Sequence, residues 1–247
     1  MSGPAPDPER PLALFAPGSL LPVQAAIRSG FAAATGAEVV FAPPAYSGVL
    51  AARILAGAAA DVFVSADPVS MAPLVAAGLV PRPRDLAGNR LAVVARRALD
   101  LGPGDSGGTI GLAALAADGV RLLLPPAATD PLGRYAAEAF ARAGLTDAIA
   151  RKRARGEVCD DLPTLAAGLR DGTVDTAVVY ATSAPQFAHA DVRPLPPALD
   201  LHDRIRFVVG TVRRPGAPPH PAADSLVGWL SAPAGRAVLR NAGFVVS

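Results

Sequence analysis

The chain has 247 residues, of which 51% are hydrophobic and 18% charged, and this composition excludes a disordered polyelectrolyte. The length suits one large domain or two lobes, and no apolar stretch reaches the roughly 20 residues that a membrane-spanning helix needs. A net charge of +2, with arginines scattered along the chain, argues against a nucleic-acid partner, and the single cysteine excludes an intramolecular disulfide.

Residues 1–10 are rich in proline and have neither a basic start nor an apolar centre. They predict a flexible leader and not a secretory signal. The expected location is therefore either the periplasm, after removal of a signal peptide, or the cytoplasm.

Apolar, β-branched runs alternate with helix-like segments from residue 12 onward. The expected strands are 12–16, 37–42, 61–65, 91–95, 120–124, 176–180 and 205–212. The expected helices are 21–31, 48–56, 68–77, 133–143, 162–169, 222–230 and 234–241. A Gly/Pro-rich passage at 101–108 interrupts the pattern. The alternation predicts an α/β fold with parallel or mixed sheets covered by helices.

Two blocks of this kind indicate two lobes with two crossings, near Leu91–Ala95 and near Arg193–Leu199. We place lobe I at residues 11–92 plus 202–247 and lobe II at residues 93–201. A ligand is expected between the lobes, beyond the carboxyl ends of the strands.

A serine, Ser19 or Ser47, stands just before each of the first two expected helices. A serine at the N-cap turns its hydroxyl and the following free N–H groups toward one point, where the helix dipole adds about half a positive charge. Two such points that meet form a site for a small oxyanion. The alternative for each serine is plain capping of its own helix.

Two further helix starts carry acidic residues, Asp130 and Asp161. Each aspartate is expected to cap its own helix, so the expected anion donors there are the backbone N–H groups of Leu132 and Leu162. Tyr180 ends a strand-like run, where its hydroxyl either donates into a cleft or lies at the surface above an apolar ring.

Catalytic groups are hard to find in this sequence. His189, His202 and His220 stand in loop-like surroundings without the spacing of a metal site, and we expect them at the surface. Cys159 has no obvious base and is expected to be buried or inert. The basic run 151–155 predicts a solvated face or loop. The sequence therefore favours a binding protein over an enzyme.

Several short motifs, spread from Leu12 to Val245, are together more specific than any one helix cap. They are Phe15-Ala16-x-x-Ser19-Leu20, Ser47-Gly48-x-Leu50, Ala56-Gly57-Ala58-x-Ala60-Asp61-Val62-Phe63-Val64-Ser65-Ala66-Asp67, Gly88-Asn89-x-Leu91, Asp130-Pro131-x-Gly133-x-Tyr135-Ala136, Val178-Val179-Tyr180-Ala181-Thr182 and Gly243-Phe244. In these motifs the chain resembles the periplasmic molybdate-binding proteins of ABC importers, which have the type II periplasmic-binding-protein fold.

The resemblance implies a two-lobed α/β fold whose interlobe cleft holds a tetrahedral oxyanion by neutral donors. The implied contacts are the hydroxyls of Ser19, Ser47 and Tyr180 and the backbone N–H groups of Leu132 and Leu162. All five would contact oxyanion oxygens and not a metal ion directly. The resemblance further implies a monomer, without a cofactor, that delivers molybdate or tungstate to the permease of an ABC importer.

The chain differs from the family around both serines. Pro17-Gly18 precedes the first, and Pro43-Pro44 and Tyr46 precede the second, where Tyr46 either narrows the pocket or adds a donor. Two alternatives stay open: a binding protein for another small oxyanion or an organic acid, and an intracellular anion-sensing module.

Overall fold

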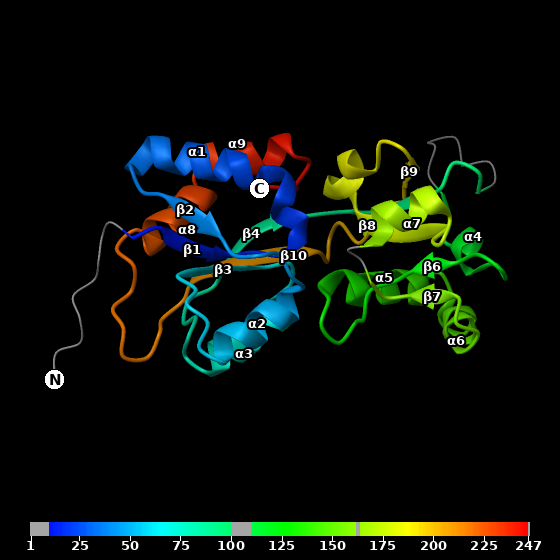
Figure 1. The fold of residues 1–247 in the computed structure, drawn as a ribbon, viewed down its shortest axis with the longest axis horizontal. Coiled ribbons are helices and arrows are strands. Elements are labelled where there is room, and N and C mark those ends of the chain that lie inside the picture. Colours follow the sequence, from blue (N-terminus) through cyan, green and yellow to red (C-terminus); the bar gives the residue numbers. More distant parts are fainter. Residues whose placement is uncertain (1–9, 100–109, 162–163, 247) are drawn as a thin grey trace. The chain divides into compact units, whose positions relative to one another are not determined.

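The computed structural model describes residues 10–99, 110–161 and 164–246 and divides into two compact units (Figure 1). Unit 1 comprises the chain up to Gly88 and from Arg206 onward, and unit 2 comprises Asn89–Ile205. The expected boundaries were 92/93 and 201/202. The strand Leu91–Ala95 lies wholly in unit 2 because both of its strand partners belong to that unit.

The sheet of unit 1 has the strand order β2-β1-β3-β10-β4. Its strands are β1 (Leu12–Phe15), β2 (Val39–Phe41), β3 (Val62–Ser65), β4 (Arg84–Gly88) and β10 (Arg206–Thr211). The first three in the order run parallel, and β10 runs antiparallel to both of its neighbours. All four residues of β3 are buried, as expected for a strand covered on both faces.

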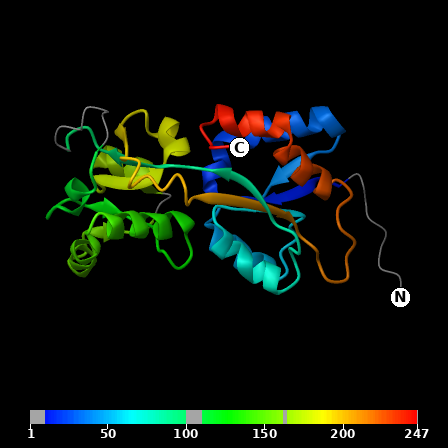
Figure 2. The same ribbon diagram turned by 180° about the vertical axis from the view of Figure 1, so that it is seen from behind.

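Helices cover both faces of this sheet. They are η1 (Gly18–Val23, a 3₁₀ helix), α1 (Gln24–Thr35), α2 (Ser47–Leu55), α3 (Pro68–Ala76), α8 (Ala223–Ser231) and α9 (Pro233–Asn241). Figure 1 shows α1, α8 and α9 on one face and α2 and α3 on the other, and the reverse view in Figure 2 again shows α9 alongside α1. Phe31 of α1 and Trp229 of α8 meet edge to face at 6.0 Å between ring centroids.

The sheet of unit 2 has the order β7-β6-β8-β5-β9. Its strands are β5 (Leu91–Ala95), β6 (Leu122–Leu123), β7 (Val158–Cys159), β8 (Thr176–Tyr180) and β9 (Asp191–Pro194). Again the first three in the order are parallel, and β5 is antiparallel to its neighbours. The helices are α4 (Ala113–Ala116), α5 (Pro131–Arg142), α6 (Thr146–Ala154), α7 (Leu165–Asp171) and the 3₁₀ helix η3 (Ala181–Phe187).

The predicted mixed α/β fold with helix-covered sheets is confirmed, and several details differ. The basic run 151–155 belongs to α6 and its C-cap, and the proposed crossing at Arg193–Leu199 lies inside unit 2, where β9 begins at Asp191. Among the described helices, none has the length and apolar character to cross a bilayer. The Gly/Pro-rich passage and residues 1–9 lie outside the described residues.

Arg10, which the predicted leader included, is fixed to unit 1. Its guanidinium pairs with the buried carboxylate of Asp61 at 2.6 Å. Burial raises the pKa of Asp61, but hydrogen bonds from Arg10 and from the Ala13 N–H outweigh this and lower the pKa overall. The leader prediction therefore fails at Arg10.

Candidate functional site

In unit 1 the three parallel strands lead into three neighbouring turns. The turn after β1 meets the turn after β2 through a parallel bridge between Pro17 and Ala45. The turn after β3 joins them through Ala66, whose N–H donates to Ser47 Oγ at 3.0 Å. The two serine-bearing segments therefore lie side by side at the carboxyl edge of the sheet.

Neither serine occupies the predicted N-cap. The caps are Pro17 and Tyr46, both in extended conformation, so Ser19 is the second residue of η1 and Ser47 the first of α2. Neither helix has a side-chain cap, which excludes plain capping for both serines.

The two hydroxyls differ in their partners. Ser47 is fully buried and accepts from Ala66, and no acceptor for its own proton lies among the described residues. Ser19 Oγ is buried and has no hydrogen-bond partner within the described part of the chain. A buried donor without an acceptor costs about 1–3 kcal/mol, so a ligand oxygen that accepts from either hydroxyl would offset this cost.

Unit 2 has a similar arrangement at the carboxyl ends of β6, β7 and β8. Tyr180 ends β8, and its hydroxyl oxygen is buried. Asp130 caps α5, and Gly133 in the first turn packs so closely on the turn after β6 that a Cβ there would lie 2.3 Å from the Pro125 carbonyl oxygen. The expected capping role of Asp130 is confirmed.

That cap corrects the expectation for Leu132. Its backbone N–H donates to Asp130 Oδ1 at 2.8 Å and is therefore already engaged within the helix. Pro131 has no N–H, and the Arg134 N–H donates to the Asp130 carbonyl. Within the described residues, the Gly133 N–H in the first turn of α5 has no acceptor, and it lies at the end where the helix dipole favours an anion.

The second expected backbone donor, Leu162, lies outside the described residues. Asp161 does not cap α7, because the N-cap is Thr164 and Asp161 instead accepts from the Thr164 N–H and hydroxyl through its carbonyl. Tyr46, the residue expected to modify the pocket, is the partly buried N-cap of α2.

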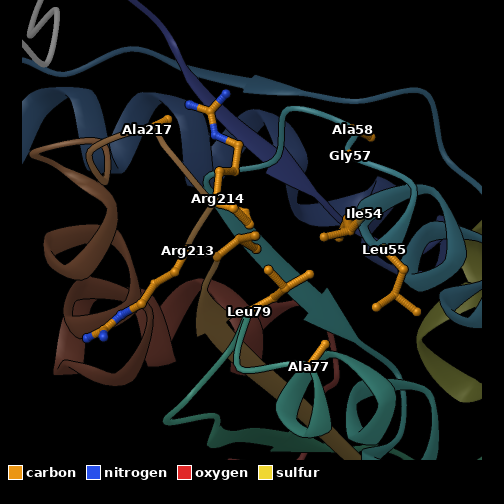
Figure 3. Close-up of a pocket in the computed structure, with 11 residues that line it drawn as sticks. Ile54, Leu55, Gly57, Ala58, Ala77, Leu79, Arg213, Arg214 and Ala217 are labelled. Atoms are coloured by element: carbon orange, nitrogen blue, oxygen red, sulfur yellow. The ribbon is translucent and has the colours of Figure 1, made fainter. Parts of the chain in front are cut away.

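A hollow of about 430 Å³ opens elsewhere in unit 1 (Figure 3). It is lined by Ile54 and Leu55, at the opposite end of α2 from Ser47, together with Ala77, Leu79 and Val212. Figure 3 shows the guanidinium groups of Arg213 and Arg214 pointing in different directions. The hollow lies at the carboxyl ends of α2 and α3, away from Ser47, so it is distinct from the predicted site.

The described residues hold no group of three or more His, Cys, Asp or Glu placed to bind a metal ion. Sequence reasoning missed the Ala66 N–H, which orients Ser47 from a strand that is distant in sequence. The motif Ser65-Ala66-Asp67 was noted, but a backbone donor leaves no signature in residue type.

Solved structures with the same fold bind different anions. The periplasmic molybdate-binding protein of Azotobacter vinelandii is 21% identical, with a TM-score of 0.77 over 96% of this chain and 99% of that chain. The sulfate-binding protein SubI of Mycobacterium tuberculosis is 16% identical, with a TM-score of 0.74 over 94% and 85%. Peb3 of Campylobacter jejuni is 15% identical, with a TM-score of 0.70 over 96% and 100%, and a further structure shows PEB3 bound to L-phospholactate.

These similarities establish the fold and leave the ligand open. No curated protein sequence matches the chain. A family model described as bacterial extracellular solute-binding protein matches residues 12–245, nearly the whole chain. The chain therefore belongs to the bacterial extracellular solute-binding protein family.

Proposed function

We propose that this protein captures molybdate or tungstate in the periplasm and delivers it to the permease of an ABC importer. The supporting observation is that Ser19 and Ser47 stand in helix first turns without capping them. Their hydroxyls in unit 1, and the buried hydroxyl of Tyr180 in unit 2, are neutral donors of the kind that suits an oxyanion. The matching family model describes solute-binding proteins, which agrees with a binding protein and not an enzyme.

Selectivity in this proposal comes from the size of the anion. Sulfate has the charge and shape of molybdate but shorter bonds, so it leaves some buried donors unpaired. Each unpaired donor costs about 1–3 kcal/mol, which discriminates between anions by one or more orders of magnitude.

A second candidate is an anion that brings its own hydrogen-bond donor, such as an organic acid or a protonated oxyanion. The observation that favours it is the Asp130 carboxylate, which already takes the Leu132 N–H and adds a negative charge at the tip of α5. A fully deprotonated dianion is repelled there, whereas a hydroxyl on the ligand donates to the carboxylate.

Thermal unfolding with molybdate, tungstate, sulfate and phosphate tests the proposal. A ligand present at 100 times its dissociation constant adds about 2.7 kcal/mol to the free energy of unfolding. We expect a raised Tm with molybdate and tungstate alone. A rise with phosphate alone supports the donor-bearing class, and no rise with any of the four contradicts the proposed function.

Ser47→Ala, measured by titration calorimetry, ties this binding to the candidate site. We expect affinity to fall tenfold or more, because an anion oxygen loses a buried donor. Ser65→Ala is the matched control, since Ser65 is also fully buried at a strand end of unit 1. Its hydroxyl already donates to the Asp67 carbonyl at 2.7 Å. Equal losses for the two variants would remove Ser47 from the site.

A further inference from the structure

Hydrogen bonds join the segment Asn89–Leu91, the first residues of unit 2, to the end of β8. Asn89 is fully buried, and its Nδ2 donates to Thr182 Oγ1 at 2.9 Å. Its Oδ1 accepts from the Arg90 N–H at 2.8 Å. The Ala181 N–H donates to the Arg90 carbonyl at 2.8 Å. These bonds join two sequence motifs that are about ninety residues apart.

The same segment flanks Tyr180 in the sheet. Leu91 stands opposite Tyr180 in the antiparallel register of β5 and β8. The bonds at Ala181 and Thr182 therefore extend the ladder just past Tyr180, where the chain leaves β8 for η3. The direction of the Tyr180 ring depends on the backbone at this exit, because a strand side chain stands perpendicular to its sheet.

The segment Asn89–Leu91 is itself anchored in unit 2. Arg90 Nη1 contacts Asp200 Oδ2 at 2.6 Å, and the Leu91 N–H donates to the Asp200 carbonyl at 2.9 Å. Asp200 is buried, and its carboxylate also accepts from the backbone and ring of His202. The backbone that carries Asn89 is therefore fixed within unit 2 while the Asn89 side chain binds Thr182.

We propose that Asn89 and Thr182 are positioning residues, which hold the Tyr180 hydroxyl where it donates to the bound anion. The inference rests on the proposed function, in which Tyr180 contacts the ligand. Neither residue touches the anion in this proposal. The hydrogen bond between Asn89 and Thr182 determines how well the Tyr180 hydroxyl is aligned for its own hydrogen bond to the anion.

The test compares Thr182→Val with Thr176→Val. Thr176 is a matched control because it is fully buried at the other end of β8, where its Oγ1 donates to the Val94 carbonyl at 2.9 Å. Each variant leaves one buried partner unpaired, so similar stability losses are expected. We expect Thr182→Val to weaken molybdate binding about tenfold, by analogy with the loss of an outer-shell contact at metal sites, and Thr176→Val to change it less than about twofold.

A double-mutant cycle distinguishes positioning from a general loss of structure. In a Tyr180→Phe background, Thr182→Val should have little further effect on the dissociation constant, because the hydroxyl that it positions is gone. Additive losses overturn the inference. Thr182→Ser keeps the accepting oxygen and should restore wild-type affinity, and Asn89→Ala breaks the same bond from the other side.

A readout without ligand separates this inference from the proposed function. With 3-fluorotyrosine incorporated, the ¹⁹F resonance of Tyr180 is assigned by its loss in Tyr180→Phe. We expect Thr182→Val to shift or broaden that resonance and Thr176→Val to leave it unchanged. If the wild-type protein binds none of the four anions, the proposed function fails, and this spectrum still decides the positioning role. An unchanged Tyr180 resonance in Thr182→Val overturns it.

Discussion

Residue type alone is a poor guide to the surroundings of some charged groups in this chain. Lys152 lies in the basic run expected at the surface, yet it is fully buried. Its Nζ donates to the carbonyls of Ala117 and Val120 and pairs with Glu157 Oε2 at 2.9 Å. Three acceptors offset the desolvation of the ammonium group, and none of them is evident from the local sequence.

The burial of two further residues also differs from the expectation. His220 is buried, because its ring accepts from the Ala222 N–H and contacts the Arg10 carbonyl oxygen at 2.9 Å. Cys159 is exposed at the end of the edge strand β7, so of the two expectations, a buried or an inert thiol, the buried one is wrong. The expectation of surface histidines holds for His189 and His202.

Asp175 should make stability depend on pH in acid. Burial raises its pKa, but hydrogen bonds from Arg121 and Arg96 outweigh this and hold the pKa at about 2. A carboxyl whose folded pKa is depressed contributes stability above its unfolded pKa, and this contribution falls as the pH drops from about 4 toward 2. We expect Asp175→Asn to lose about 2 kcal/mol at pH 7 and less at pH 2.5.

Urea unfolding at the two pH values measures this difference. Asp85→Asn is the control, because Asp85 pairs with Arg206 at 3.0 Å and both side chains are exposed. An exposed pair contributes about 0–1 kcal/mol. A loss at Asp175 that is the same at both pH values would contradict the assignment of the ionised form.

At the scale of the elements, the sequence was most informative about long helices and buried strands. The strands at 91–95 and 176–180 were predicted with their observed bounds. The edge strands β4 and β9 and the helix α6 were missed, since their polar residues give no clear period. Tertiary pairing, which a local pattern does not contain, specifies these elements.

The candidate site shows the same division between local and tertiary information. Turn chemistry located Ser19, Ser47 and Tyr180 at strand ends, because the signal lies within a few residues. Whether a donor is available depends on partners elsewhere in the fold, as the Ala66 N–H on Ser47 shows. At Leu132 the competing partner is only two residues away in the sequence. The N–H group that was expected to donate to the anion already donates to the capping carboxylate of Asp130.

The pair α8 and α9 allows two glycines to be compared. A Cβ at Gly235 would lie 2.3 Å from the Trp229 carbonyl oxygen, whereas a Cβ at Gly228 meets nothing within 4 Å. We expect Gly235→Ala to lower the free energy of unfolding by about 1–3 kcal/mol, since the obstructing atom is backbone. Gly228→Ala should raise it by up to about 1 kcal/mol through helix propensity. Urea unfolding checks both, and a neutral Gly235→Ala would show that α9 shifts freely.

At the scale of the whole molecule, the two sheets share one plan. Each has three parallel strands and then an antiparallel strand from a different part of the chain. The alternation along the sequence predicted two α/β blocks, but the boundaries required knowledge of which strands pair. The antiparallel strand of unit 1 is β10, which the chain reaches only after unit 2.

This plan predicts unequal behaviour of two fragments. Residues 89–205 contain all five strands of their sheet and a core cluster around Val94, Leu123 and Val179, so the isolated segment should unfold cooperatively in urea. Residues 1–88 lack β10, which separates β3 from β4, and should show no cooperative transition. A cooperative 1–88 fragment would contradict the role given to β10.

The position of β10 also orders events on the ribosome. Unit 2 is one unbroken stretch and can fold as soon as Ile205 has left the exit tunnel, while residues before Asn89 still wait for a partner strand. At bacterial rates of synthesis this wait is on the order of ten seconds. During that time the apolar residues of β3 lack the strand partner that they have in the finished fold, and exposed apolar segments of this kind are what chaperones shield from aggregation.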